Sequence, residues 1–287
     1  MNEAGSDVVI IGAGVHGASG AYHLAQSGAR VTVVERLTPA GGPTGLSSGV
    51  CRAYYTNAFL AEAARDSIRM MLDFEGIGQG HDSGYRRTGF LYLHPPQDVE
   101  EVIDNAARLN GLDIRVELHT GDDLQRQFPQ FVLDDIGIGA YEVEAGYADP
   151  AGTTAGMIAG AVAAGAALRS HAAVQGLRLR PGGGAVVLLA GGESLAAERL
   201  LIAAGPWTAS LASLAQAPFR RPPSRAGSSW RISNETVRWT NPGCGRRGSR
   251  RRAARRSRID GGRTAQFVDR AVRERGLRHG APVRARA

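Results

Sequence analysis

Residues 7–36 read DVVIIGAGVHGASGAYHLAQSGARVTVVER, and this stretch predicts a βαβ unit that binds a dinucleotide. Its first five residues form a continuous apolar run, which is typical of a parallel strand buried on both faces. Residues 14–27 have the pattern of a helix, and residues 30–35 form a second apolar strand. The order of strand, glycine-rich turn, helix and strand therefore predicts an α/β fold of the Rossmann type.

The glycines of this stretch fit the spacing GxGxxG between the first strand and the helix. Gly12 permits the tight turn, Gly14 lets the backbone approach a pyrophosphate, and Gly17 lets the helix pack on the strand. The N–H groups at the start of the helix then face the phosphates. Glu35 ends the second strand, where a carboxylate accepts hydrogen bonds from ribose hydroxyls and repels a 2′-phosphate. These residues favour FAD or NAD over NADP.

The rest of the chain up to residue 217 alternates between helical and strand patterns. A loop rich in glycine and serine is expected over 38–52. Helices are expected over 57–74, 97–109 (with Gly111 as C-cap), a short stretch opened by Thr120 and Asp123 as a capping box, and 151–164. Residues 136–150 are expected to form a strand followed by a turn, and strands are expected over 88–94, 114–118, 166–179, 185–189 and 199–203. The last three form a small antiparallel meander, whose final strand returns to the main sheet.

The net charge of +7 is distributed unevenly along the 287 residues. Residues 1–219 hold 14 Arg against 23 acidic residues, whereas residues 220–287 hold 20 Arg against 4, and the chain has no lysine. The Arg-rich stretch has neither helical nor strand periodicity, so it predicts no core of its own.

The composition favours a soluble protein of a reducing compartment, and we expect the cytoplasm. Cys51 and Cys244 are too few for a disulfide framework and do not have the spacing of metal ligands. The first strand begins near Asp7, which leaves no room for a targeting peptide. The most apolar segment, 155–168, is shorter than the ~20 residues that cross a bilayer. No membrane partner and no metal are expected.

Four further blocks identify a family that the chain resembles: GPTGLSSGVCRAYY (42–55), RRTGFLYL (86–93), GAYEVEAGYADP (139–150) and LLIAAGPW (200–207). With the glycine motif, they resemble the FAD-dependent amine oxidoreductases that include D-amino-acid oxidase, glycine oxidase and sarcosine oxidase. The chain is most similar to sarcosine oxidase beta-subunit-like members, over about residues 7–218. The resemblance implies FAD as the cofactor and a small amine or amino acid as the substrate.

The resemblance also implies the residues that bind the cofactor. The small residues of the loop would let backbone N–H groups and hydroxyls reach the phosphate oxygens. Trp207 could instead be a core aromatic, the loop an ordinary surface loop, and His16 a position where only the backbone matters. The implied cofactor-binding residues are Gly12, Gly14, Val15, His16, Gly17, Glu35, Arg36, Thr44, Gly45, Ser47, Ser48, Gly49, Val174, Ala204, Gly205 and Trp207.

Arg52 matches a position at which some relatives bind the substrate carboxylate, and Tyr55 is a candidate for the same pocket. A guanidinium suits bidentate contact with a carboxylate, although Arg52 could also be a surface arginine paired with a neighbour. The implied reaction is oxidation of the C–N bond of sarcosine or another N-methyl amino acid, by hydride transfer to the flavin. No catalytic side chain is assigned, because an amine bound in its neutral form needs no general base.

The expected fold class is α/β, with a Rossmann-like FAD-binding domain and a β-meander, interleaved with an incomplete α+β substrate domain and followed by an unpatterned Arg-rich tail. The expected segments are 1–87 and 147–217 for the FAD-binding domain, 88–146 for the substrate domain and 218–287 for the tail. Relatives continue well beyond the turn at Trp207, so we expect a truncated chain, whose tail arises from a frameshift or a degraded gene. The alternative is a disordered basic arm on a nucleotide-binding module, which would bind nucleic acid without catalysis.

Overall fold

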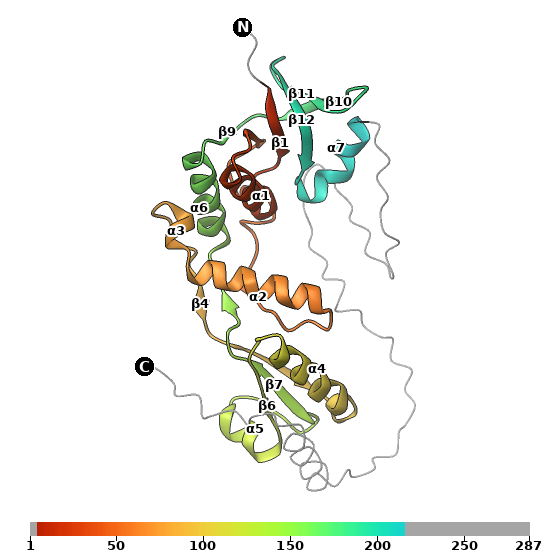
Figure 1. Cartoon of the computed structure of the whole chain (residues 1–287). Coiled ribbons are helices and arrows are strands. Elements are labelled where there is room, and N and C mark those ends of the chain that lie inside the picture. Colours follow the sequence, from red (N-terminus) through yellow and green to blue (C-terminus); the bar gives the residue numbers. More distant parts are fainter. Residues whose placement is uncertain (1–4, 216–287) are drawn as a thin grey trace. The chain divides into compact units, whose positions relative to one another are not determined.

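The computed structural model describes residues 5–215, which divide into two compact units (Figure 1). Unit 1 comprises residues 5–47, 75–82 and 150–215, and unit 2 comprises residues 48–74 and 83–149. These units are defined by contacts within the chain. The bounds of the FAD-binding and substrate domains that the sequence suggests stay a prediction.

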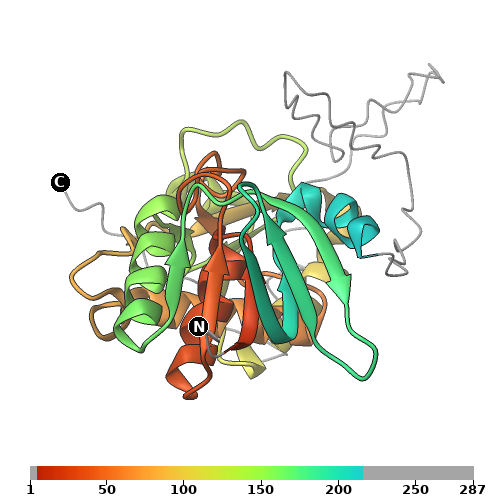
Figure 2. The same cartoon turned by 90° about the horizontal axis from the view of Figure 1, so that it is seen from above.

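Unit 1 is built on a six-stranded sheet whose centre is parallel (Figure 2). In the order β10-β11-β12-β1-β2-β9, β1 pairs in parallel with both β12 and β2, and β2 pairs in parallel with β9. The strands are β1 (Ser6–Ile11), β2 (Val31–Val34), β9 (Ala167–Arg169), β10 (Val174–Leu179), β11 (Ala185–Leu189) and β12 (Ser194–Ile202). β10, β11 and β12 form an antiparallel meander that returns to the sheet through β12. The predicted α/β class and the meander are confirmed.

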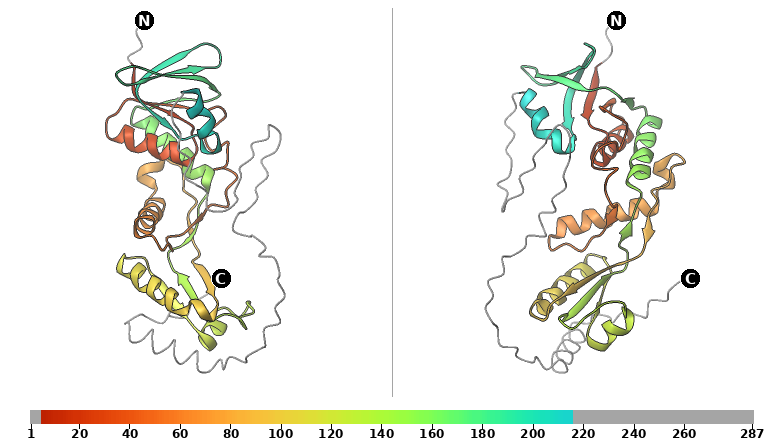
Figure 3. Two further views of the ribbon diagram at one scale, coloured as in Figure 1. Left: turned by 90° about the vertical axis from the view of Figure 1, so that its right-hand side faces the viewer. Right: turned by 180° about the vertical axis from the view of Figure 1, so that it is seen from behind.

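Helices cover both faces of this sheet. Helices α1 (Val15–Gln26) and α6 (Pro150–Ala163) lie side by side (Figure 3) and approach closely through small residues. A Cβ atom at Gly160 would lie 2.4 Å from the carbonyl oxygen of Ile77 and 2.9 Å from the ring of Tyr22, so this position requires glycine. On the other face, the short helix α7 (Thr208–Leu214) packs against an apolar core formed by β1, β2 and the meander. That core comprises Val9, Ile11, Val34, Leu177, Val187, Leu189, Leu195 and Ala197.

The predicted strand over 166–179 is wrong in one respect, because the structure has two strands there. β9 pairs with β2, and β10 begins the meander. His171 lies between them with φ of +57°, a left-handed conformation that interrupts a strand. β12 also begins earlier than predicted, at Ser194 rather than Arg199.

Unit 2 contains an antiparallel sheet in the order β5-β7-β6, on which α4 packs (Figure 3). Its elements are β3 (Val50–Cys51), α2 (Ala58–Leu72), β4 (Arg86–Arg87), β5 (Phe90–His94), a 3-10 turn (Pro96–Asp98), α4 (Val99–Gly111), β6 (Val116–His119), α5 (Gly121–Gln127), β7 (Ile138–Glu142) and β8 (Gly146–Tyr147). Helix α3 (Glu75–Gly78), which the sequence did not predict, belongs to unit 1. Short strands β3, β8 and β4 form a second small sheet. The core lies between α4, α2 and the larger sheet and contains Ile68, Val102, Ile103, Leu109, Leu118 and Ile138.

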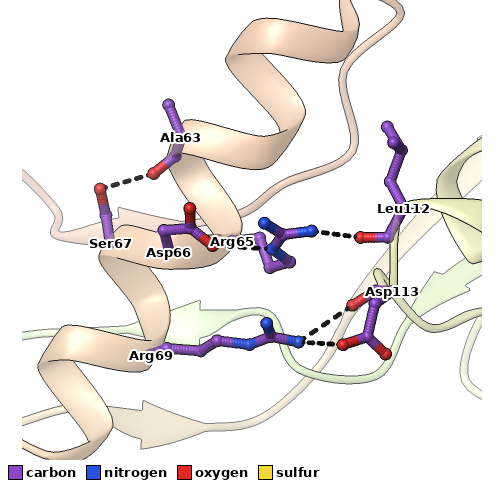
Figure 4. Close-up of polar contacts among 7 residues, drawn as sticks. All are labelled: Ala63, Arg65, Asp66, Ser67, Arg69, Leu112 and Asp113. Atoms are coloured by element: carbon purple, nitrogen blue, oxygen red, sulfur yellow. Dashed lines mark hydrogen bonds and ion pairs between the residues drawn. The ribbon is translucent and has the colours of Figure 1, made fainter.

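Two arginines of α2 attach this helix to the turn between α4 and β6 (Figure 4). Arg65 donates to the carbonyl oxygen of Leu112 at 2.6 Å, and Arg69 donates to the carboxylate of Asp113 at 2.6 Å. The predicted C-cap at Gly111 is wrong, since Gly111 is the last residue of α4. The left-handed residue is Asp113, with φ of +59°, and aspartate tolerates this conformation better than most residues.

The capping box expected at Thr120 is also wrong. Thr120 stands at the N-cap of α5, but its side chain makes no cap hydrogen bond. Asp123 instead lies 2.8 Å from Nδ1 of His119, a side chain with no exposed surface. A buried imidazole requires a polar partner, and this requirement directs the carboxylate away from the helix start.

Residues 5–215 contain no helix with the length and apolar character needed to cross a bilayer. They also contain no group of three or more His, Cys, Asp or Glu side chains placed to bind a metal ion. Cys244 and the Arg-rich tail over 218–287, with the frameshift and nucleic-acid interpretations of that tail, lie outside the described residues.

Candidate functional site

The glycine turn of unit 1 connects β1 directly to α1. Gly12 has φ of +106°, and a Cβ atom there would lie 2.6 Å from the carbonyl oxygen of Ala203. A Cβ atom at Gly17 would overlap the carbonyl oxygen of Gly12. Both positions therefore exclude any side chain, Gly12 by backbone conformation and Gly17 by close packing of helix and turn.

The start of α1 presents a positive dipole that no side chain of its first turn neutralises. Gly14 is the N-cap, and the first turn contains no acidic residue. His16 lies in this turn and is exposed, so its side chain does not block the helix end. A helix N-terminus with these properties suits a phosphate or pyrophosphate group.

Glu35 is fixed beside this turn by two backbone hydrogen bonds. Its carboxylate accepts from the N–H of Ala13 and from the N–H of Leu37, each at 2.8 Å. The side chain is half-buried, just beyond the end of β2. Each carboxylate oxygen can accept more than one hydrogen bond, so Glu35 can still accept from the hydroxyls of a ribose.

The loop after β2 folds back onto the glycine turn. The hydroxyl of Thr44 accepts from the N–H of Val15 at 3.2 Å, and the N–H of Ala40 donates to the carbonyl oxygen of Ala13 at 3.0 Å. A Cβ atom at Gly45 would overlap the carbonyl oxygen of Ala40. The N–H of Ser47 continues the turn by donating to the carbonyl oxygen of Thr44 at 3.1 Å. The loop has a defined conformation that brings Thr44 to the start of α1.

Trp207 lies beyond the end of β12, in a short 3-10 turn (Gly205–Trp207) that begins after Ala204. The guanidinium of Arg36 stands over its ring, 4.8 Å from the centroid. A Cβ atom at Gly42 would lie 3.8 Å from the same ring. Trp207 is half-buried, so it is not enclosed as a core aromatic would be.

These residues gather at one edge of the sheet in unit 1, because β1, β2 and β12 are parallel and end at the same edge. Val174 starts β10, two residues after Ala172, whose N–H donates to the carbonyl oxygen of Glu35 at 2.9 Å. The cofactor-binding residues predicted in unit 1 thus lie on neighbouring segments. Ser48 and Gly49 belong to unit 2, where the carbonyl oxygen of Gly49 accepts from Ala148 at 2.9 Å.

In unit 2, Arg52 lies among aromatic side chains. Its guanidinium carbon is 5.2 Å from the ring centroid of Tyr55 and 6.0 Å from that of Tyr92. Burial by itself would lower the pKa of Arg52, but a hydrogen bond with Tyr92 and the negative charge of Glu142 raise it overall. Within residues 5–215, no carboxylate forms an ion pair with Arg52. Its positive charge is therefore available to an anionic group.

Glu142 is the functional candidate that the sequence reasoning missed. It is 1% exposed, and its carboxylate accepts from the N–H of Ala53 at 2.6 Å and from the N–H of Tyr54 at 3.1 Å. The hydroxyl of Tyr92 donates to the same carboxylate at 3.4 Å. Burial raises the pKa of Glu142, and these hydrogen bonds and Arg52 oppose the rise. One signal was present, since Glu142 shares the strand face of Ile138 and Ala140, which are buried.

Two more contacts fix the segment that carries Arg52. The ring of Tyr54 stacks on Tyr92, with centroids 4.2 Å apart and planes at 21°. Arg108 of α4 donates to the carbonyl oxygen of Tyr55 at 2.6 Å and also to the side chain of Asn105. Residues 52–55 are thus held by β5, β7 and α4.

Comparison with known proteins shows which proteins the chain is similar to. The family model described as FAD dependent oxidoreductase matches residues 7–279, a range that runs past residue 218, where the sequence resemblance was expected to end. Mitochondrial dimethylglycine dehydrogenase of Rattus norvegicus is 30% identical over 206 residues, which are 70% of this chain. Glycine oxidase from Geobacillus kaustophilus matches with a TM-score of 0.63 at 25% identity, over 73% of this chain. Iminodiacetate oxidase from a Chelativorans species matches with a TM-score of 0.58 at 30% identity, over 72% of this chain.

The chain spans only part of each relative. It covers 24% of the dimethylglycine dehydrogenase, 58% of the glycine oxidase and 57% of the iminodiacetate oxidase. The family model nevertheless matches most of its length, residues 7–279. The chain belongs to the family of FAD-dependent oxidoreductases.

Proposed function

We propose that this chain acts as an FAD-dependent oxidoreductase on the C–N bond of a small amino acid, with sarcosine or another N-methyl amino acid as the substrate. The observation that carries the proposal is the carboxylate of Glu35, held by the N–H of Ala13 beside a helix N-terminus without acidic residues. The relatives are named for dimethylglycine, glycine and iminodiacetate, which share an amine and a carboxylate. A nucleotide-binding module with a nucleic-acid arm is not favoured by these matches.

The residues of unit 1 fit the ADP half of FAD. The start of α1 would face the pyrophosphate, and Glu35 would accept from the ribose hydroxyls. We propose 1–87 and 147–217 as the segments of the FAD-binding domain. The residues proposed to contact the cofactor are Gly12, Gly14, Val15, His16, Gly17, Glu35, Arg36, Thr44, Gly45, Ser47, Ser48, Gly49, Val174, Ala204, Gly205 and Trp207.

In unit 2, Arg52 would bind the substrate carboxylate in a bidentate manner, with Tyr55 beside it. Because Arg52 has no ion pair within the described residues, its guanidinium would not have to leave a protein carboxylate first. The bound flavin would supply the acceptor for the hydride from the carbon next to the nitrogen. The role of the chain's own residues is to bind and orient the amino acid.

Mixing the FAD-loaded chain with sarcosine in the absence of oxygen tests this function. The proposal expects loss of the visible flavin absorbance, and it expects Arg52→Gln to slow that loss at least about tenfold by removing the bidentate contact. Arg126→Gln is a matched control, since Arg126 is an exposed arginine of unit 2 that pairs only loosely with Asp123, at 3.7 Å. A chain that binds FAD and leaves sarcosine, dimethylglycine and glycine unoxidised would contradict the proposal.

The cysteine usage supports a reducing compartment, and we propose the cytoplasm as the site of action. Cell fractionation with an antibody against the chain checks this location. Recovery of the chain outside the cytoplasmic fraction would contradict it.

A further inference from the structure

Glu142 stands out because it is a buried carboxylate that forms no ion pair with a cationic side chain among residues 5–215. Its two oxygens accept from the adjacent backbone N–H groups of Ala53 and Tyr54. These residues directly follow Arg52 in the chain. A buried carboxylate is costly unless hydrogen bonds satisfy it, so the conformation of this turn and the burial of Glu142 depend on each other.

A second connection leads from Glu142 to the guanidinium itself. The hydroxyl of Tyr92 donates to Glu142 at 3.4 Å, and the guanidinium carbon of Arg52 lies over the ring of the same tyrosine, 6.0 Å from its centroid. Tyr92 therefore contacts both the buried carboxylate of Glu142 and the guanidinium of Arg52. The arginine gains a nearby negative charge, yet no carboxylate of the described part of the chain forms an ion pair with it.

We propose that Glu142 is a positioning residue for recognition of the substrate carboxylate, because it fixes the Ala53–Tyr54 turn and, through Tyr92, the orientation of Arg52. The inference rests on the proposed role of Arg52. It predicts that Glu142 determines the preference for amines that carry a carboxylate over amines that do not. The residue acts through Arg52 and does not touch the substrate.

The test measures the affinity of the FAD-loaded full chain for sarcosine and for N-methylethylamine, which lacks the carboxylate. Calorimetry gives the two dissociation constants, and their ratio is the carboxylate preference. Glu142→Gln replaces one acceptor oxygen by an NH₂ donor, so one of the two backbone N–H groups loses its partner. We expect the carboxylate preference to fall about tenfold, as for a lost hydrogen bond to a charged group.

The matched control is Glu117→Gln on the neighbouring strand β6. Glu117 is also buried, but its carboxylate pairs with Arg115 and not with the segment 52–55. The control should leave the ratio of the two affinities unchanged. If Glu142 had a merely structural role, Glu142→Gln would weaken the binding of both amines by the same factor. The ratio of the two affinities would then stay unchanged, and this result would overturn the inference.

Two further variants separate the possible failures. Tyr92→Phe removes the connecting hydroxyl and keeps Glu142 in place, and we expect it to lower the preference about threefold, a smaller effect than that of Glu142→Gln. If Glu142→Gln does not fold, this variant decides, and an unchanged preference overturns the inference. If Arg52→Gln itself keeps the full preference, the proposed function of Arg52 fails; if only Arg52→Gln lowers it, the inference about Glu142 fails alone.

Discussion

Unit 1 and unit 2 each hold one charged side chain in place through backbone N–H groups, but over very different distances along the chain. In unit 1, Glu35 binds the N–H of Ala13, 22 residues away. In unit 2, Glu142 binds the N–H of Ala53, 89 residues away. The first arrangement lies within a single βαβ unit and follows from a local motif, whereas the second exists only after three distant segments have packed together. Local motifs therefore identify the candidate cofactor site of unit 1 more readily than the candidate substrate site of unit 2.

The largest effect expected from this comparison is a break in the local motif. Gly17→Ala should lower the free energy of unfolding by more than about 3 kcal/mol, because its Cβ atom would overlap the carbonyl oxygen of Gly12, which is backbone and cannot rotate away. Urea unfolding measures the change. Gly76→Ala in α3 is the control, since a Cβ atom there meets nothing within 4 Å. Equal stability of the two variants would contradict the packing described for the glycine turn.

A second prediction separates the charge of Glu35 from the shape of the turn. Glu35→Gln should lower the affinity for ADP about tenfold and the free energy of unfolding by about 1–3 kcal/mol, because an amide presents a donor to one of the two N–H groups. Titration calorimetry with ADP and urea unfolding measure the two changes. Glu193→Gln, on an exposed turn, removes only a solvent-exposed ion pair with Arg169, so it should leave the ADP affinity unchanged and alter stability by less than about 1 kcal/mol. Unaltered ADP affinity of Glu35→Gln would show that the ribose is bound elsewhere.

The hydrogen bond between the loop and the helix start should have a smaller effect. Thr44→Val keeps the shape of the side chain and removes the hydroxyl that accepts from Val15, so we expect a loss of about 0.5–1.5 kcal/mol in stability. Thr56→Val, at an exposed position of unit 2, is the control for the same chemical change. If both variants unfold at the same urea concentration, the loop is held by its backbone contacts alone.

The smallest effect is expected from an exposed contact that joins β1 to the start of β2. The hydrogen bond from the side chain of Arg30, followed by the one from its backbone N–H, holds the pKa of Asp7 below its ordinary value of 3.8. The lowered folded-state pKa means that the contact stabilises the fold above pH 3.8 and that this stabilisation is lost as the pH falls through the lower value. Asp7→Asn should therefore be less stable than the natural chain at neutral pH, and the difference should shrink in acid. A difference that grows in acid, or that appears equally in the exposed control Asp134→Asn, would contradict this assignment.

The sequence predicted those parts of the fold in which neighbours along the chain decide the structure. The glycine turn, the strand before it and the acidic end of β2 follow from spacing and apolar runs, and the structure has β1, α1 and β2 within a residue or two of the expected bounds. The break at His171 was not predictable, because its left-handed conformation leaves no trace in the apolar pattern. Likewise, the left-handed residue after α4 is Asp113 rather than Gly111, in a turn that the arginines of α2 bind.

The residues of the candidate substrate site also differ in whether the sequence predicted them. Arg52 was found through a family resemblance in a contiguous block, whereas Glu142 was not assigned a role, because its partners lie on other segments. The only local sign was a charged residue, Glu142, on the strand face that also carries the apolar residues Ile138 and Ala140. Such a sign indicates that a partner exists but does not say which segment provides it.

We infer that unit 1 holds the ADP half of FAD, with Glu35 at the ribose. The most direct measurement is to purify the full chain, denature it and identify the released nucleotide by mass spectrometry, with added FAD if the chain is isolated without it. We predict FAD in equal molar amount to the chain, and a loss of that FAD in Gly17→Ala. Recovery of NAD or NADP, or a folded chain that takes up no FAD when FAD is added, would contradict the claim.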